Sequence, residues 1–145
     1  MSYSKAFSQS ISILSFIEIG SKNENCDYLS IKIISQKLNI PIPSVKRITG
    51  MLKKQNILKT KSGLDGGLAL CRPPYDINLF DVFISIEGHE PLFKVYDEFN
   101  LNSFDKDKDR AKFVIDNEKK FFNNIENVML NKLKKISLND ILDNK

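Results

Sequence analysis

The basic residues of this chain are concentrated in one stretch that contains no acidic residue. Between Tyr28 and Leu64 there is no Asp or Glu, although the 145 residues include 18 acidic ones. Eight of the 22 basic residues lie in the same stretch: Lys32, Lys37, Lys46, Arg47, Lys53, Lys54, Lys59 and Lys61. A local excess of positive charge directs an electrostatic field toward a polyanion. The alternative is a solvated positive face that has no partner.

Residue types that catalysis or metal binding needs are scarce. His89 is the only histidine, and with Glu90 it provides fewer donors than the three or four protein ligands of a zinc site. No nucleophile beside a general base and no phosphate-binding loop is visible. We therefore expect no enzyme, no catalytic residue, no metal site and no cofactor.

The two cysteines, Cys26 and Cys71, are too few for a disulfide framework, which is typical of a protein in a reducing cytosol. The first 20 residues lack the features of a signal peptide, and no apolar run approaches the roughly 20 residues of a membrane span. We expect a cytoplasmic protein that does not contact membranes. Cys26 lies in a polar loop, so oxidation of its thiol is an open alternative as a regulatory signal.

Apolar spacing predicts two helices before the densest basic region. Residues 3–19 place an apolar face at helical intervals, and Gly20 is the expected end of that helix. Ser30 is expected to cap a short helix over residues 31–38.

A turn and a third helix follow. Residues 39–43 contain two prolines, which disfavour helical geometry in the residues that precede them. Pro43 suits the first turn of a helix that extends to about Gln55. Val45, Ile48 and Leu52 are expected to be buried in this helix.

The pattern then changes to two short strands, residues 57–61 and 68–71. The connection between them contains Gly63, Gly66 and Gly67, which permit the positive φ angles of a tight hairpin. The order of helix, short helix, turn, helix and hairpin predicts a helix-turn-helix followed by a wing.

The second half of the chain is predicted to be helical around one irregular segment. Asn78 is expected to cap a helix over 79–87 that ends at Gly88, and residues 89–106 are expected to form a loop with at most a helical turn. A long helix is predicted over about 108–135, and Ser137 is expected to cap a short helix through Leu142. The apolar stripe of the long helix comprises Ala111, Ile115, Phe122, Ile125, Met129, Leu133 and Ile136, widened by Val114, Phe121 and Val128.

So long a helix beside a small domain exposes more apolar surface than the domain covers, and pairing with a second copy is the economical solution. The expected fold class is mainly α, with a winged helix-turn-helix domain that has a two-stranded β wing, and a long C-terminal dimerisation helix. The expected domains are 1–88 for DNA binding, 89–107 as a loop or linker, and 108–145 for the dimerisation helix and the last short helix.

In a helix-turn-helix the first residues of the second helix meet base edges in the major groove. Ser44, Lys46 and Arg47 occupy those positions, and Arg or Lys can donate to guanine. Phosphate contacts, which carry no sequence information, are expected from four lysines: Lys53, Lys54, Lys59 and Lys61. In the wing, Ser62, Gly66 and Gly67 are expected to bring the backbone close to DNA. The alternatives are a basic helix that only maintains solubility and a hairpin that is only a connector.

The segments KTKSGLDGG (59–67), LCRPP (70–74), INLFDV (77–82) and EG (87–88) resemble the Rrf2 family of winged-helix transcriptional regulators. The segments PLFKVY (91–96) and SLNDIL (137–142) resemble the branch of that family without an iron–sulfur cluster, so the resemblance covers nearly the whole chain. It implies a dimeric repressor with a long dimerisation helix and with base contacts near Lys46 and Arg47.

The chain departs from the family pattern in three places. Ser62 stands where family members often carry a wing arginine. Residues 89–106 contain none of the three cysteines that bind a cluster in other members, so the resemblance implies no iron–sulfur cluster here. Ser103 stands where the cluster-free branch often has a cysteine.

The sequence therefore predicts a sequence-specific transcriptional regulator that binds double-stranded DNA as a homodimer, most simply as a repressor. The alternative is a winged-helix module that binds a protein and not DNA. A steep salt dependence of duplex binding would separate the two.

Overall fold

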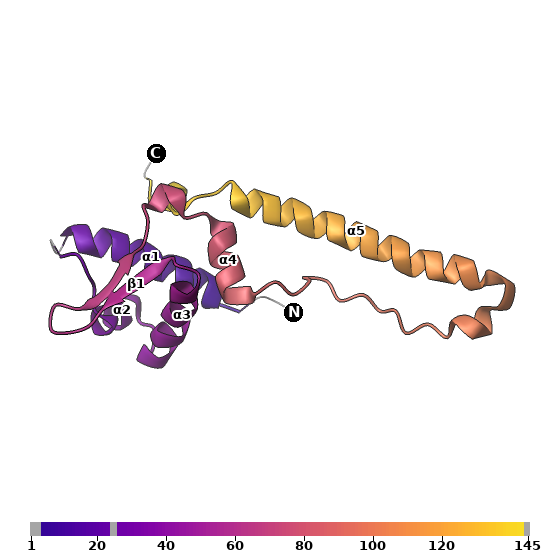
Figure 1. Cartoon of the computed structure of the whole chain (residues 1–145), viewed down its shortest axis with the longest axis horizontal. Helices are drawn as coiled ribbons and strands as arrows, with labels where there is room; N and C mark the ends of the chain where they lie inside the picture. Colours follow the sequence, from indigo (N-terminus) through magenta and orange to yellow (C-terminus); the bar gives the residue numbers. More distant parts are fainter. Residues whose placement is uncertain (1–3, 24–25, 144–145) are drawn as a thin grey trace. The chain divides into compact units, whose positions relative to one another are not determined.

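The structure is a computed structural model that describes residues 4–23 and 26–143. It divides into two compact units, one formed by residues 1–88 together with 133–145 and the other by residues 89–132. Figure 1 shows the order of the helices and strands. Within the described residues, no helix combines the length and the hydropathy that a membrane crossing requires.

Three helices open the first unit, as predicted: α1 (Ala6–Asn23), α2 (Ile31–Leu38) and α3 (Ile42–Lys54). The Ser30 hydroxyl accepts a hydrogen bond from the Ile33 amide at 3.2 Å, which confirms the predicted cap of α2. Asn39 ends α2 in the left-handed conformation, with φ of 53°. The predicted first residues of α1, up to residue 3, lie outside the described part of the chain.

Gly20 does not end α1, so that prediction was wrong. The helix continues to Asn23 and Gly20 is buried inside it. A Cβ atom at residue 20 would lie 2.6 Å from Cδ1 of Leu29. Gly20 is therefore a packing residue, which lets the fully buried Leu29 side chain lie against the helix backbone.

The wing consists of β1 (Leu58–Lys61) and β2 (Gly67–Leu70), paired antiparallel with Lys61 opposite Gly67. A further bridge joins Leu29 to Leu68. The Leu29 amide donates to the Leu68 carbonyl at 2.9 Å, and the Leu68 amide donates to the Leu29 carbonyl at 2.7 Å. This bridge, which the sequence did not predict, fixes the wing to the residue before the α2 cap.

The helix after the wing is α4 (Leu79–Glu87), and the Asn78 side chain caps it as predicted. A short 3-10 helix, η1 (Pro74–Asp76), precedes it, and α6 (Leu138–Leu142) follows near the end of the chain. Ser137 and Asp140 form a capping box at α6. The Leu138 amide donates to the Ile77 carbonyl at 2.7 Å, so the C-terminal residues pack into the first unit.

One apolar core holds the first unit together. Its fully buried side chains come from α1, α2, α3, the wing, α4, α6 and the segments between them: Ile13, Leu14, Ile17, Leu29, Ile34, Val45, Ile48, Leu52, Ile57, Leu68, Ile77, Val82 and Leu138. Val45, Ile48 and Leu52 are among them, as predicted.

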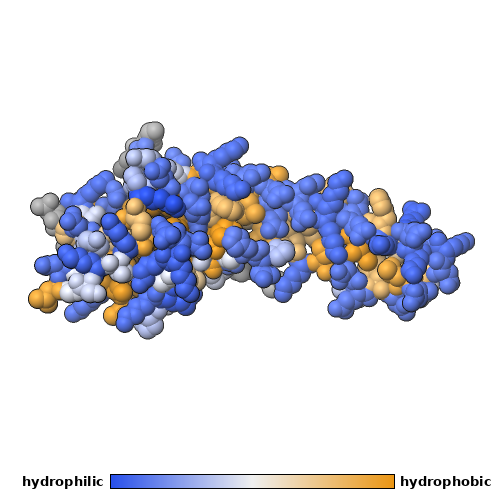
Figure 2. All heavy atoms as spheres, viewed as in Figure 1, coloured by the Kyte–Doolittle hydropathy of each residue, from blue (hydrophilic) through white to orange (hydrophobic). Residues whose placement is uncertain are grey.

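The second unit contains an extended segment, the 3-10 helix η2 (Leu101–Asp107) and most of α5 (Lys108–Lys134). The rings of Phe93 and Phe122 lie 5.0 Å apart between centroids, and Lys119 pairs with Asp97 at 3.2 Å. Among the residues of this unit only Ala111 and Ile115 are buried. Figure 2 shows apolar side chains exposed along α5 and the preceding segment. The predicted fold class, a winged helix-turn-helix with a long C-terminal helix, is confirmed.

We expect Gly67→Ala to lower the free energy of unfolding by about 2–4 kcal/mol. Gly67 has φ of 148°, and a Cβ atom there would lie 2.3 Å from the Leu29 carbonyl oxygen. A urea titration followed by circular dichroism measures the change. Ser62→Ala, at an exposed position of the same hairpin, is the control and should change stability by no more than about 0.5 kcal/mol. Equal stability of Gly67→Ala and the wild type would show that the close approach of residue 67 to the Leu29 carbonyl does not require glycine.

Candidate nucleic-acid interface

Helix α3 has one buried face and one exposed basic face. Val45, Ile48, Thr49 and Leu52 are buried. Successive residues are about 100° apart around the helix axis. The opposite face therefore carries exposed residues that lie one or two turns from their neighbours on that face: Pro43, Lys46, Arg47, Lys53 and Lys54. The buried face fixes the helix in the domain and leaves the basic face to solvent.

Hydrogen bonds between side chain and backbone define how α3 begins and how its buried face is satisfied. The Ser35 hydroxyl donates to the Ile40 carbonyl at 2.6 Å, across the turn between α2 and α3. The buried Thr49 hydroxyl donates to the Val45 carbonyl at 2.8 Å. Pro43 occupies the first turn of α3, as its fixed φ angle favours. The start of α3 is therefore fixed both by the turn that precedes it and by contacts within the helix.

The predicted base-reading residues lie together on the first turns of α3. Lys46 and Arg47 are exposed, and Ser44 is half-buried. The predicted phosphate ligands Lys53 and Lys54 are exposed at the other end of the same helix.

The wing lysines share one face of β1. Lys59 and Lys61 are both exposed, and because alternate residues of a strand point the same way, they lie on one side of the hairpin. Lys61 Nζ lies 5.7 Å from the centroid of the Tyr28 ring. Ser62, at the end of β1, is exposed as well.

The two wing glycines that the sequence associates with DNA also have a role inside the hairpin. The Gly66 amide donates to the Gly63 carbonyl at 3.1 Å. A Cβ atom at Gly66 would lie 2.2 Å from the Lys61 carbonyl oxygen, and Gly67 faces the Leu29 backbone. Gly66 is therefore required by the internal geometry of the wing, and Gly67 by the close approach of the wing to Leu29.

Charge pairing differs between the basic stretch and the rest of the chain. Salt bridges of the described residues join Lys22 to Glu18, Arg72 to Asp81 and Lys119 to Asp97. None of them involves a basic residue between Tyr28 and Leu64. The positive charge of α3 and the wing is thus left available to an external anion.

Two contacts that position the wing were not predicted. One is the Leu29–Leu68 bridge, and the other is the Arg72–Asp81 pair at 3.1 Å, which ties the end of the wing to α4. The sequence signal for the first was an apolar residue directly before the Ser30 cap. For the second it was an arginine nine residues before an aspartate in the first turn of the predicted helix.

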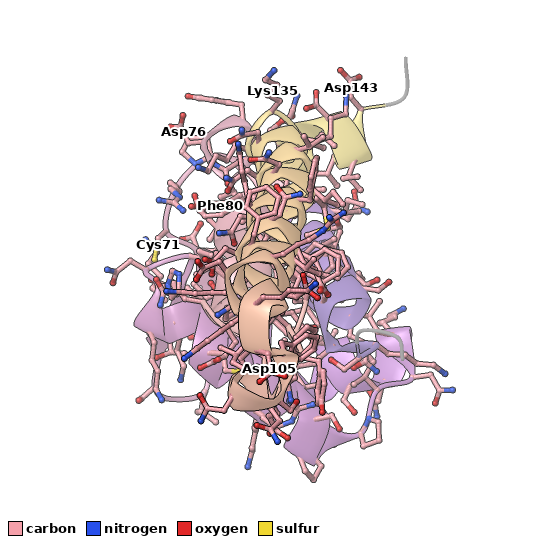
Figure 3. All side chains as sticks on the ribbon, turned by 90° about the vertical axis from the view of Figure 1, so that its right-hand side faces the viewer. Cys71, Asp76, Phe80, Asp105, Lys135 and Asp143 are labelled. Atoms are coloured by element: carbon pink, nitrogen blue, oxygen red, sulfur yellow. The ribbon has the colours of Figure 1, made fainter. Side chains whose placement is uncertain are left out.

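The two thiols have different surroundings. Cys26 is half-buried, its Sγ donates to the Tyr28 carbonyl at 3.3 Å, and it lines a pocket of about 510 Å³ that Lys59 and Leu70 also line. Cys71, labelled in Figure 3, is exposed at the end of the wing.

Comparisons with known proteins find similar chains among transcriptional regulators. The family model of Rrf2, described as an iron-dependent transcriptional regulator, matches residues 3–144. YwnA of Bacillus subtilis, which is named as an HTH-type transcriptional regulator, is 29% identical over 133 residues, or 92% of this chain and 91% of YwnA.

Solved structures show the same fold. CymR of Bacillus subtilis, titled the global cysteine regulator, is similar with a TM-score of 0.64 and 19% identity over 98% of this chain and 96% of CymR. The oxidized form of Staphylococcus aureus CymR has a TM-score of 0.68 and 15% identity, over 100% of this chain and 98% of that one. At these identities the likeness concerns the fold alone.

The donor atoms of this chain do not fit the iron centre that the family description suggests. An iron–sulfur cluster is held by several cysteine thiolates close together. The described residues contain no group of three or more His, Cys, Asp or Glu that could hold a metal ion. Residues 89–107 include no cysteine, and the only two in the sequence are Cys26 and Cys71.

Proposed function

The chain belongs to the Rrf2 family of transcriptional regulators, and we propose that it acts as a homodimeric repressor that binds duplex DNA through α3 and the wing. The observation that carries the proposal is the exposed basic face of α3, whose cations form no salt bridge with a described residue. This face lies in the same unit as a hairpin with two exposed lysines. A helix of this kind fits the major groove, and the adjacent hairpin can follow the DNA backbone.

We assign the contacts by residue type and position. Lys46 and Arg47 donate to base edges, with Ser44 beside them, and so supply sequence discrimination. Lys53, Lys54, Lys59 and Lys61 bind phosphates and fix the register of the protein on the duplex. Ser62, Gly66 and Gly67 place the wing backbone near the DNA.

A second copy of the chain is the partner that the second unit requires. Val114, Phe121, Ile125 and Val128 recur on α5 at intervals of seven, four and three residues, and each is at least half exposed. This spacing is that of a helix that packs against another helix. A unit with two buried side chains is too poorly packed to be stable without a partner, and twofold pairing also supplies two recognition helices.

The proposed division of labour follows from these assignments. Residues 1–88 bind DNA, residues 89–107 connect, and residues 108–145 carry the dimerisation helix and the last short helix. A protein that represses transcription in this way would act in the cytoplasm. The proposed function involves neither catalysis nor a cofactor. A winged-helix module that binds a protein is the alternative, and it predicts binding that depends much less on salt.

Oxidation of Cys26 is the signal that we propose. Hydrogen peroxide would transfer one oxygen atom to the thiol, giving a sulfenic acid and water. The pocket next to the Cys26 sulfur is also lined by Lys59 and Leu70 of the wing. A larger, polar sulfur group there would displace the wing lysine from its phosphate. The solved oxidized form of Staphylococcus aureus CymR is a precedent within the fold.

Substitutions of Arg47 and Lys59 should have different effects on DNA binding. We expect Arg47→Ala to reduce discrimination at one base pair by about 5- to 150-fold, the loss of one bidentate contact. Lys59→Ala should weaken all duplexes about equally and reduce the salt slope by about one. Fluorescence anisotropy with a duplex selected from random sequences, and with single-base variants of it, measures both. Lys112→Ala, at an exposed lysine of α5, is the control. Unchanged binding by both variants would refute the assigned interface.

Substitution of Val128 should dissociate the dimer. Val128 is 72% exposed in the single chain, and a carboxylate there would be buried between two helices without a partner. We expect the wild type to sediment as a dimer and Val128→Asp as a monomer at the same micromolar concentration. Asn127→Asp adds the same charge one residue away, at another exposed position of α5, and should remain dimeric. A monomeric wild type would exclude the homodimer.

Removal of the Cys26 thiol should abolish the response to peroxide. We expect hydrogen peroxide to weaken duplex binding by the wild type and by Cys71→Ser, and to leave binding by Cys26→Ser unchanged. Anisotropy titrations before and after oxidation, with mass spectrometry of the protein, measure both steps. If Cys26→Ser loses binding as the wild type does, Cys26 is not the sensor.

A further inference from the structure

Gly50 differs from the other five glycines of the chain. Gly20, Gly66 and Gly67 stand where a Cβ atom would collide with a neighbouring residue, and Gly63 and Gly88 have positive φ angles that favour glycine. Gly50 lies within α3 between residues of ordinary helical geometry, and apart from the adjacent backbone of α3 itself no heavy atom lies within 4 Å of the position a Cβ atom would take. Nothing within the described chain therefore requires glycine at this position.

Glycine in the interior of a helix is unfavourable. It gains more backbone freedom in the unfolded chain than any other residue and has no side chain to cover the helix backbone. Gly50 is followed by four further residues of α3, so it is neither a cap nor a stop. Alanine would fit in the open space and would favour the helix. The recognition helix thus carries a residue that weakens it.

The position of Gly50 on α3 suggests an external reason. Gly50 comes one turn after Lys46 and one turn before Lys54. At about 100° per residue, it lies at the centre of the exposed basic face and opposite the buried Ile48 and Leu52. The middle of that face is therefore bare backbone, with long cationic side chains around it.

We propose that Gly50 is the point of closest approach between α3 and duplex DNA, where the helix backbone itself contacts the wall or floor of the major groove. This inference rests on the proposed function and adds a residue and a depth of insertion to it. Glycine allows a backbone to approach a ligand more closely than any other residue. A Cβ atom would hold the helix away from the groove by about one carbon–carbon bond length, roughly 1.5 Å. Lys46 and Arg47 would then fall short of the base edges.

The proposal predicts opposite effects of one methyl group on folding and on binding. We expect Gly50→Ala to raise the midpoint of thermal unfolding by about 3 °C, because alanine favours the helix. Affinity for the selected duplex should fall about ten-fold or more, comparable to the loss of one base contact. The salt slope of binding should not change, because no charge is removed. Differential scanning calorimetry and anisotropy titrations measure these quantities.

Further variants separate a contact with DNA from other causes. Gly50→Ser and Gly50→Val should lower affinity progressively with side-chain size. Asn127→Ala, at an exposed position of α5 away from the proposed dimer face, also replaces a poor helix former and should stabilise the chain without loss of affinity. This control excludes an effect of helix stability alone.

Two results would overturn the inference while the proposed function stands. Wild-type affinity of Gly50→Ala would show that the backbone does not approach the duplex closely. A lower unfolding midpoint of Gly50→Ala would show that glycine has a role inside the chain. Failure of the wild type to bind any duplex at low salt would instead refute the proposed function, and this inference with it.

Discussion

The Leu29–Leu68 bridge is the contact on which the arrangement of the first unit depends. Its two backbone hydrogen bonds, at 2.9 and 2.7 Å, join the wing to the residue that directly precedes the Ser30 cap of α2. The same backbone pair therefore determines where the helix-turn-helix begins and where the hairpin lies. It forms because Gly67 has no Cβ atom, and because Gly20 leaves space in α1 for the Leu29 side chain. Two glycines and one leucine, far apart in sequence, thus set the relation between the wing lysines and α3.

This dependence explains how much of the fold could be predicted from the sequence. The cap at Ser30, the proline turn before α3 and the hairpin follow from local rules, and the structure has them where they were predicted. Gly20 was misassigned because a local rule reads a glycine after an apolar helix as a stop, whereas its cause is a residue nine positions later. The exposure of Lys46 and Arg47 followed from helical periodicity. The significance of Gly50 could not be predicted, because it depends on knowing that the space around it is empty.

The charged residues of the first unit also divide into those that support the fold and those left available to an external ligand. Arg72 is held by Asp81 in a contact that supports the wing, whereas the cations of α3 and β1 form no salt bridge with any residue that the structure describes. An exposed salt bridge contributes only about 0–1 kcal/mol to stability, so the fold loses little by leaving these cations unpaired. A carboxylate beside Lys59 or Arg47 would compete for their donors with the phosphate or the base edge that each is proposed to contact. The proposed binding of DNA therefore accounts for the absence of acids between Tyr28 and Leu64, whereas folding does not require it.

In the second unit the exposed side chains are apolar, so burial against a partner is favourable for them. Its helix α5 is held to the extended segment by one ring contact and one ion pair, and Phe121 and Val128 remain exposed to water. Burial of such side chains against a second copy is favourable by roughly 25 cal/mol for each Å² of apolar surface. In the proposed homodimer, folding of this unit is inseparable from association, and association supplies a twofold axis. A recognition helix with few base contacts binds one half-site of DNA weakly. Two such helices in a twofold dimer would engage two half-sites at once, and this would raise the affinity of the basic face of α3 for DNA.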